Sequence, residues 1–169
     1  FGRVGKNLIK KCIGFDMNIF VYDPFVDEKI VSSLGGKKVN NFHKTIQEMD
    51  YVSLHMPLTE KTRNLINMKV LCTMKKNSII INTSRGGIIN EVDLNEALNK
   101  SMIFGAGLDV FEKEPPKADN PLLKNKKVLL SPHSATFTEE CNERMSKETI
   151  QNIIDFFDNK LDKSKIVKL

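Results

Sequence analysis

Short apolar runs rich in β-branched residues alternate along this chain with stretches of helical periodicity, and no other feature limits the fold as strongly. The strand-like runs lie at residues 17–22, 51–54, 78–82, 105–110 and 128–130. Helical patterns lie at residues 4–15, 27–34, 42–48, 67–74 and from Asn90 onward, where we expect Asp93 to support the helix cap. This βα repetition predicts a parallel sheet covered by helices, the doubly wound, Rossmann-like α/β class.

The chain opens on part of a glycine-rich turn. Gly2 and Gly5 enclose Arg3 and Val4 at the start of the first predicted helix, as the later positions of a G-x-G-x-x-G turn do. Backbone N–H groups at such a helix start bind a pyrophosphate. Asp23 follows Gly2 by 21 positions (23 − 2), close to where an acidic residue accepts hydrogen bonds from a ribose 2′-hydroxyl, which favours NAD over NADP. Alternatively, Asp23 is a turn residue before the proline that follows it.

The strand that normally precedes such a turn is expected to be missing from this sequence, together with the first glycine of the motif. In a doubly wound sheet that strand is central, and here it would lie between the strand ending at Asp23 and the strand at residues 51–54. Its loss would leave unpaired strand edges. We therefore expect residues 1–169 alone to fold poorly and to be inactive.

Arg85, Glu114 and His133 together form a candidate catalytic set. A guanidinium binds a carboxylate through two parallel hydrogen bonds, and an imidazole backed by a carboxylate exchanges a proton with an alcohol or carbonyl near neutral pH. The three residues are 29 and 19 positions apart (114 − 85 and 133 − 114), so they would meet only through folding. Plainer alternatives are an exposed arginine after a strand, a solvated loop acid and a buried, hydrogen-bonded histidine.

Composition argues against several other classes of protein. The formal net charge is +5, but the lysines are scattered among acidic neighbours and the chain has no Trp, so we expect no nucleic-acid partner. Three widely spaced cysteines and three scattered histidines give no disulfide framework and no metal site. No apolar run reaches the length of a membrane span, so we expect no membrane partner and a cytoplasmic protein.

The C-terminal part of the sequence changes character. We assign residues 1–136 to a dinucleotide-binding domain and residues 137–169 to a long helix and tail. From Thr138 the helix has an apolar stripe made of Cys141, Met145, Ile150, Ile153, Ile154, Phe157 and Leu161. We expect this stripe to pack against a core and to cover a neighbouring domain or subunit.

Six motifs follow one another along the chain: FGRVG at 1–5, YDP at 22–24, HMPLT at 55–59, NTSRGG at 82–87, LDVFEKEP at 108–115 and SPHSA at 131–135. Together they resemble the motifs of the D-isomer-specific 2-hydroxyacid dehydrogenases, particularly the phosphoglycerate-dehydrogenase-like branch. The resemblance implies a nucleotide-binding domain inserted into a discontinuous substrate domain, with catalysis in the cleft between them. The helix from Thr138 would then return toward the substrate domain.

The resemblance also implies roles for single residues. Arg85 would bind the carboxylate and carbonyl oxygen of the substrate, His133 would be the acid–base group, and Glu114 would orient it. The pyrophosphate would bind at Arg3 and Val4, and the ribose at Asp23. The cofactor-binding residues implied are Gly2, Arg3, Val4, Gly5, Asp23, His55, Met56, Pro57, Thr83, Ser84, Asp109 and Ser134, with the nicotinamide near Thr83, Asp109 and the Ser134 backbone.

The function expected from these features is hydride transfer between NAD(H) and a small D-2-hydroxy acid or 2-oxo acid, by an enzyme that is a homodimer at full length. Candidate substrates are 3-phosphoglycerate, hydroxypyruvate and glyoxylate. One alternative is a corepressor-like protein that senses NAD(H). Another is a relative that oxidises formate or phosphite, although Glu114 beside a histidine favours true acid–base exchange.

Overall fold

The computed structural model describes residues 1–166 and divides into two compact units. The first unit is Phe1–His133, and the second begins at Ser134. The predicted division into a dinucleotide-binding domain at residues 1–136 and a helix and tail at residues 137–169 stays a prediction. Residues 167–169, which that prediction assigns to the C-terminal tail, lie outside the described residues.

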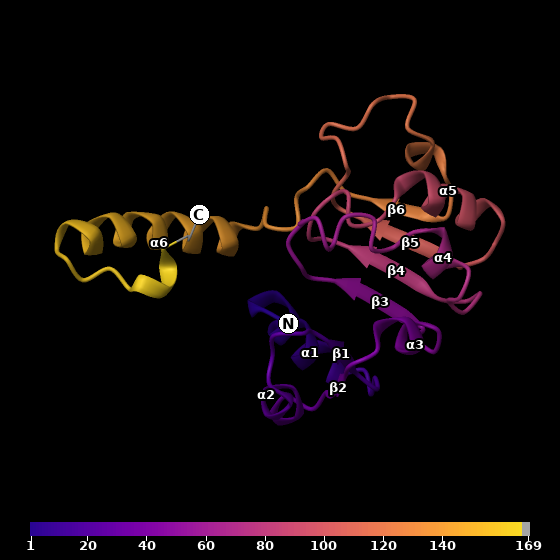
Figure 1. Cartoon of the computed structure of the whole chain (residues 1–169). Coiled ribbons are helices and arrows are strands. Elements are labelled where there is room, and N and C mark those ends of the chain that lie inside the picture. Colours follow the sequence, from indigo (N-terminus) through magenta and orange to yellow (C-terminus); the bar gives the residue numbers. More distant parts are fainter. Residues whose placement is uncertain (167–169) are drawn as a thin grey trace. The chain divides into compact units, whose positions relative to one another are not determined.

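The first unit contains two parallel sheets, which confirms the predicted α/β class (Figure 1). A small sheet pairs β1 (Phe20–Tyr22) with β2 (Lys37–Val39). A larger sheet contains four strands in chain order: β3 (Tyr51–Leu54), β4 (Ile79–Asn82), β5 (Gly105–Leu108) and β6 (Val128–Leu130). Within residues 1–166 no ladder joins β1 to β3.

Short helices precede and connect these strands. They are α1 (Arg3–Ile13), α2 (Glu28–Ser33), α3 (Phe42–Ile46), α4 (Met68–Leu71), α5 (Glu91–Asn99) and the 3₁₀ helix η1 (Pro121–Lys124). Side chains of Asp27, Asn41, Asn90 and Asn120 accept backbone N–H groups at the first turns of α2, α3, α5 and η1. None of the described helices combines the length and the apolar character that a membrane crossing requires.

Asp93 has a different role from the one expected. The Asn90 side chain caps α5 by accepting the Asp93 N–H at 3.0 Å, as predicted. The carboxylate of Asp93, however, accepts the backbone N–H of Met68 at 2.8 Å, at the start of α4. The side chain therefore joins two neighbouring helices, a long-range contact that a local capping pattern does not reveal.

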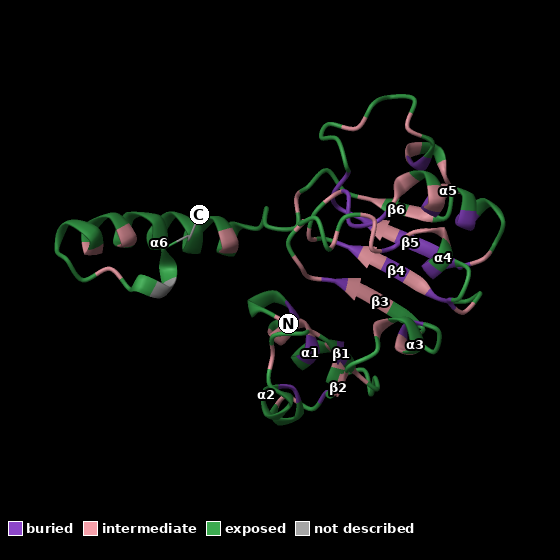
Figure 2. Cartoon of the chain, in the orientation of Figure 1, coloured by how far each residue is buried: buried purple, intermediate pink, exposed green. Residues whose placement is uncertain are grey.

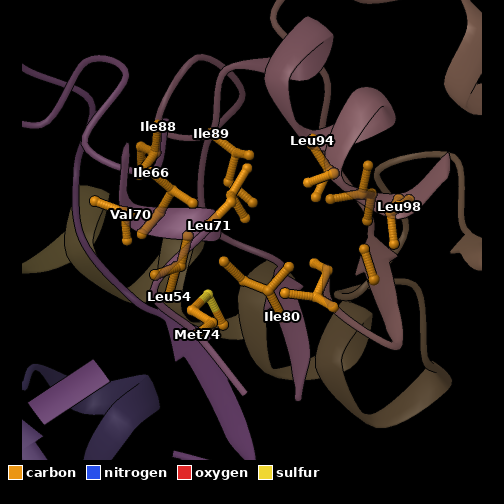
Figure 3. Close-up of a cluster of buried hydrophobic side chains, with 14 of the residues drawn as sticks. Leu54, Ile66, Val70, Leu71, Met74, Ile80, Ile88, Ile89, Leu94 and Leu98 are labelled. Carbon is orange, nitrogen blue, oxygen red and sulfur yellow. The ribbon is translucent and has the colours of Figure 1, made fainter. Parts of the chain in front are cut away.

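The main hydrophobic core lies around the four-stranded sheet (Figure 2). Figure 3 shows side chains from β3, α4, β4 and α5 converging in it, and Leu71, Ile80 and Leu98 are fully buried. A second, much smaller cluster contains Ile9, Val21 and Val31, which come from α1, β1 and α2.

The second unit contains α6 (Glu139–Phe157) and the 3₁₀ turn η2 (Lys163–Lys165). Thr138 caps α6 by accepting the backbone N–H of Cys141 at 3.1 Å. The helix ends at Phe157, so the predicted stripe extended too far when it included Leu161. No residue of α6 is buried, and its large apolar side chains include exposed ones at Ile150, Ile153, Ile154, Phe156 and Phe157.

Candidate active site

The four strands of the larger sheet end in register. Their pairing aligns Leu54 with Asn82, Asn82 with Leu108, and Leu108 with Leu130. The residues that follow these four are His55, Thr83, Asp109 and Ser131. In open α/β sheets, ligands bind at this carboxyl edge of the strands. The fold therefore gathers three of the predicted cofactor residues at one edge, together with the loops that carry the three predicted catalytic residues.

A surface pocket of about 340 Å³ lies beside this edge and the start of α1. Three separated segments line it, and the lining residues are Gly2, Arg3, Val4, Gly5, His55, Met56, Pro57, Thr83, Ser84 and Arg85. Nine of the predicted cofactor residues and one predicted catalytic residue thus share a pocket. Asp23 and Asp109 are not among its lining residues, and Ser134 belongs to the second unit.

The start of α1 presents backbone donors to this pocket. The first helical hydrogen bond runs from the Lys6 N–H to the Gly2 oxygen at 3.0 Å, so the preceding N–H groups of the first turn have no acceptor within the helix. The N-cap residue Gly2 provides no side-chain cap, and a Cβ placed there would meet no atom within 4 Å. The arrangement has the donors and the open space that an anionic group requires.

Asp23 follows β1 and is partly buried. Its carboxylate accepts the backbone N–H of Phe25 at 2.8 Å. An aspartate carboxyl is ionised at neutral pH, so Asp23 can act as a hydrogen-bond acceptor there.

Asn82 shapes the loop that carries Arg85. This side chain is 2% exposed, and its Nδ2 donates to the Arg85 carbonyl oxygen at 2.9 Å. Its Oδ1 accepts the Ser84 N–H at 3.1 Å and the Ser84 hydroxyl at 2.8 Å. The Arg85 side chain is exposed, and its Nη1 donates to the Ser84 carbonyl oxygen at 2.6 Å. The guanidinium is thus held at the pocket by a backbone turn that Asn82 fixes.

Glu114 and His133 form a hydrogen-bonded pair. The His133 Nδ1 lies 2.6 Å from Glu114 Oε2, while Glu114 Oε1 accepts the Phe111 N–H at 3.0 Å. The hydrogen bond to His133 is the main reason that the pKa of Glu114 lies below its ordinary value, and the Phe111 N–H contributes further. Because Nδ1 is engaged, Nε2 is the imidazole nitrogen suited to proton exchange with a substrate.

A close backbone contact joins the Arg85 loop to the Glu114 loop. A Cβ at Gly86 would lie 1.7 Å from the carbonyl oxygen of Phe111, so only glycine fits there. Phe111 in turn donates its N–H to Glu114. The pair of Glu114 and His133 does not line the pocket itself. The contact at Gly86 joins the loop that carries Arg85 to the loop that carries Glu114.

Two polar contacts at the strand ends were not predicted. The Ser131 hydroxyl donates to the carboxylate of Asp109 at 2.5 Å, and Asp109 is 3% exposed. This contact ties the end of β5 to the loop that carries His133. His55 Nε2 and the Ser53 hydroxyl form a hydrogen bond of 2.8 Å. Burial lowers the pKa of His55 and favours its neutral form.

Sequence alone offered a signal for only part of this network. An Asn at the end of a β-branched strand favours a local turn, so the pattern around Asn82 could have been recognised. Ser131 lies 22 positions from Asp109 (131 − 109), and no local pattern links the two residues.

Residues 1–135 match the family model described as the D-isomer specific 2-hydroxyacid dehydrogenase, NAD binding domain. The chain is 44% identical over 142 residues to a D-3-phosphoglycerate dehydrogenase from Methanocaldococcus jannaschii, covering 84% of this chain and 27% of that protein. It is 42% identical over 155 residues to a glyoxylate reductase from Korarchaeum cryptofilum, covering 92% of this chain and 46% of that protein.

A solved structure shows similarity to the same family. A D-isomer specific 2-hydroxyacid dehydrogenase from Lactobacillus delbrueckii ssp. bulgaricus, solved in an NAD complex, matches with a TM-score of 0.87 at 26% identity over 98% of this chain and 53% of that one. The chain thus spans about half the length of these relatives, or less. It belongs to the D-isomer specific 2-hydroxyacid dehydrogenase family, in the part that forms the NAD-binding domain.

Proposed function

We propose that the full-length protein carrying this chain is an NAD-dependent oxidoreductase that interconverts a small 2-oxo acid and a D-2-hydroxy acid. The observation that supports this most directly is the registered carboxyl edge of β3 to β6. The loops that carry Arg85, Glu114 and His133 follow the neighbouring strands β4, β5 and β6 at this edge. The pocket beside the edge is also lined by the start of α1.

The residues around the pocket fit a dinucleotide. The backbone N–H groups at Arg3 and Val4 would hold the pyrophosphate, and the ionised carboxylate of Asp23 would accept hydrogen bonds from the adenosine ribose. We assign His55, Met56 and Pro57 to the wall of the cofactor cleft. Thr83, Asp109 and the Ser134 backbone are assigned to the nicotinamide end, and Ser84 is assigned to cofactor binding. When bound, NAD(H) supplies or accepts the hydride.

The proposed catalytic residues divide the remaining chemistry between them. Arg85 would bind the substrate carboxylate and orient its carbonyl group through a two-pronged contact. In the direction of reduction, His133 would give a proton from Nε2 to the carbonyl oxygen while the carbonyl carbon receives the hydride. Glu114 would hold the imidazole through Nδ1 and stabilise its protonated form.

Substrate and assembly are proposed in finer detail from the relatives. Relatives named D-3-phosphoglycerate dehydrogenase, glyoxylate reductase and hydroxypyruvate reductase support 3-phosphoglycerate, glyoxylate and hydroxypyruvate as candidate substrates. Exposed apolar side chains on α6 support a homodimer at full length. We propose the cytoplasm as the compartment.

The test is NADH oxidation by the full-length protein with a panel of 2-oxo acids. We expect turnover with at least one small 2-oxo acid and its loss in Arg85→Lys, because lysine lacks the planar fork that binds a carboxylate. NADH affinity should stay within about twofold, since the guanidinium is assigned to the substrate. Arg63→Lys, at an exposed arginine near Glu112, is the matched control. Tight NADH binding with no turnover on any 2-oxo acid would instead favour the corepressor-like alternative.

A further inference from the structure

The segment that carries Glu114 has no regular structure of its own, yet one carboxylate bonds to two points along it. The segment runs from the end of β5 at Leu108 to the start of η1 at Pro121. Glu91 Oε1 accepts the backbone N–H of Glu112 at 2.5 Å, and Glu91 Oε2 accepts Asn120 Nδ2 at 2.7 Å. A single side chain therefore closes the loop around Glu114.

Glu91 sits where it can connect the two catalytic loops. It is the first residue of α5 and follows Arg85 by six positions (91 − 85). It is partly buried, and both of its carboxylate oxygens are engaged by the Glu114 segment. Because α5 continues directly from the Arg85 loop, Glu91 links that loop to Glu114 independently of the backbone contact at Gly86.

We propose that Glu91 is a positioning residue, which holds the segment 112–120 so that Glu114 can orient His133 beside Arg85. Its effect on catalysis rests on the proposed dehydrogenase function, whereas its effect on Glu114 does not. Glu114 makes two hydrogen bonds that depend on close approach, with the Phe111 N–H at 3.0 Å and with His133 at 2.6 Å. A shift of about 1 Å in the segment would lengthen both hydrogen bonds, and misplacement of this size can cost about 100-fold in rate.

We call the two hydrogen bonds that Glu91 accepts from Glu112 and Asn120 the Glu91 clamp. The donor and acceptor roles in this clamp are fixed at Asn120. The Asn120 Oδ1 accepts the Leu122 N–H at 3.0 Å at the start of η1, so Nδ2 must point to Glu91. Glu91→Gln would keep only one acceptor oxygen, so its amide NH2 would face either Asn120 Nδ2 or the Glu112 N–H. Asn120→Asp would place two carboxylates together. The double variant Glu91→Gln/Asn120→Asp restores one donor and one acceptor with reversed polarity, and still leaves acceptors for the Glu112 and Leu122 N–H groups.

The experiment measures the pKa of the Glu114 carboxyl by an NMR pH titration of the full-length protein. In the wild type this pKa lies below its ordinary value because of His133 and the Phe111 N–H, while the charge of Asp109 acts in the opposite direction. We expect each single variant to raise the pKa of Glu114 toward its ordinary value and the double variant to bring it back. Glu96→Gln, on the exposed face of α5 where Glu96 pairs with Lys100, should change nothing.

Kinetics form the second measurement. Each single variant should lower kcat for 2-oxo acid reduction by about tenfold with little change in the KM for NADH, and the double variant should return to within about twofold of wild type. The proposal is overturned if the single variants only lower the melting temperature and leave the pKa of Glu114 unchanged, or if the double variant fails to restore it. A wild type without turnover whose Glu114 still responds to these variants would refute the dehydrogenase function and leave the clamp standing.

Discussion

The two sheets of the first unit are built from similar βα repeats but are packed very differently. The sheet of β3 to β6 is supported by the larger core, with fully buried side chains from α4, β4 and α5. The sheet of β1 and β2 rests on a cluster of three buried residues, Ile9, Val21 and Val31. Tyr22 on β1 and Tyr51 on β3 are also exposed, at 45% and 55%.

Because of this difference, the two parts of the candidate site are expected to differ in local stability. The groups proposed for proton transfer and substrate binding stand on the well-packed sheet, whereas the proposed pyrophosphate and ribose sites stand on α1 and β1. Loops at a rigid sheet edge hold their geometry, and lightly packed elements open at low free-energy cost. We therefore expect that substitutions can perturb the proposed catalytic geometry and the proposed cofactor binding separately.

The largest expected effect is on the catalytic side of this comparison. His133→Ala in the full-length protein should lower kcat by about 10²–10⁴-fold, because a positioned acid–base group contributes that much. NADH affinity should stay near wild type, since His133 follows β6, whereas the proposed pyrophosphate and ribose sites lie at α1 and after β1. Steady-state kinetics and NADH titration test both statements. His43→Ala, at an exposed histidine on α3, is the control, and wild-type turnover in His133→Ala would remove the proton-donor assignment.

Core truncations compare the packing of the two sheets directly. Leu98→Ala should cost about 3–4 kcal/mol of unfolding free energy, because Leu98 is fully buried in the larger core. Ile9→Ala should cost about 2 kcal/mol, since the small cluster around it can collapse into the space. Denaturant titration of the full-length protein measures both. Equal losses would show that the two sheets are equally well packed, against the comparison.

Gly86→Ala tests whether the loops that carry Arg85 and Glu114 depend on their close contact. The new Cβ would collide with the Phe111 carbonyl, and forcing the loops apart should cost about 3 kcal/mol. Gly107→Ala is the matched control, because a Cβ there meets only side-chain atoms of Ile81 at 3.7 Å, an ordinary contact. Chemical denaturation gives the stabilities. Similar values for the two variants would contradict the tight packing at Gly86.

The smallest expected effect is on the cofactor side. Asp23→Asn should weaken NADH binding about tenfold, or about 1.4 kcal/mol, and should narrow the preference over NADPH, because the repulsive charge at the ribose is removed. The kcat at saturating NADH should change little. Asp50→Asn, at a surface pair with Lys75, serves as control. Fluorescence titration with NADH and with NADPH measures both affinities. An unchanged NADH affinity would remove Asp23 from the cofactor site.

Regular elements were readable from the sequence because their periodicity is local. The runs at residues 51–54 and 78–82 became β3 and β4, and the cap at Asn90 started α5. The strand predicted at residues 17–22 was too long, since β1 begins at Phe20. β2 was missed because Lys37-Lys38-Val39 is too short and too polar to give a strand pattern.

The candidate site was only partly predictable, for a different reason. The segments that line the pocket were predicted from turn motifs and from the family resemblance. The contacts that hold them, such as Ser131 to Asp109 and Glu91 to Asn120, join residues 22 and 29 positions apart. Nothing in the local sequence specifies such a pair, because it depends on which strand ends become neighbours in the sheet.

The shared register of Leu54, Asn82, Leu108 and Leu130 limits where this chain can change its length. One residue added inside a strand would advance everything after it by about 3.3 Å and turn its side chains to the opposite face. Insertions and deletions should therefore be tolerated at the amino ends of the strands, as in the turn at residues 100–104, and rejected between a strand and the loop that follows it. Length variation in descendants of this sequence would collect on the side of the sheet away from the chemistry.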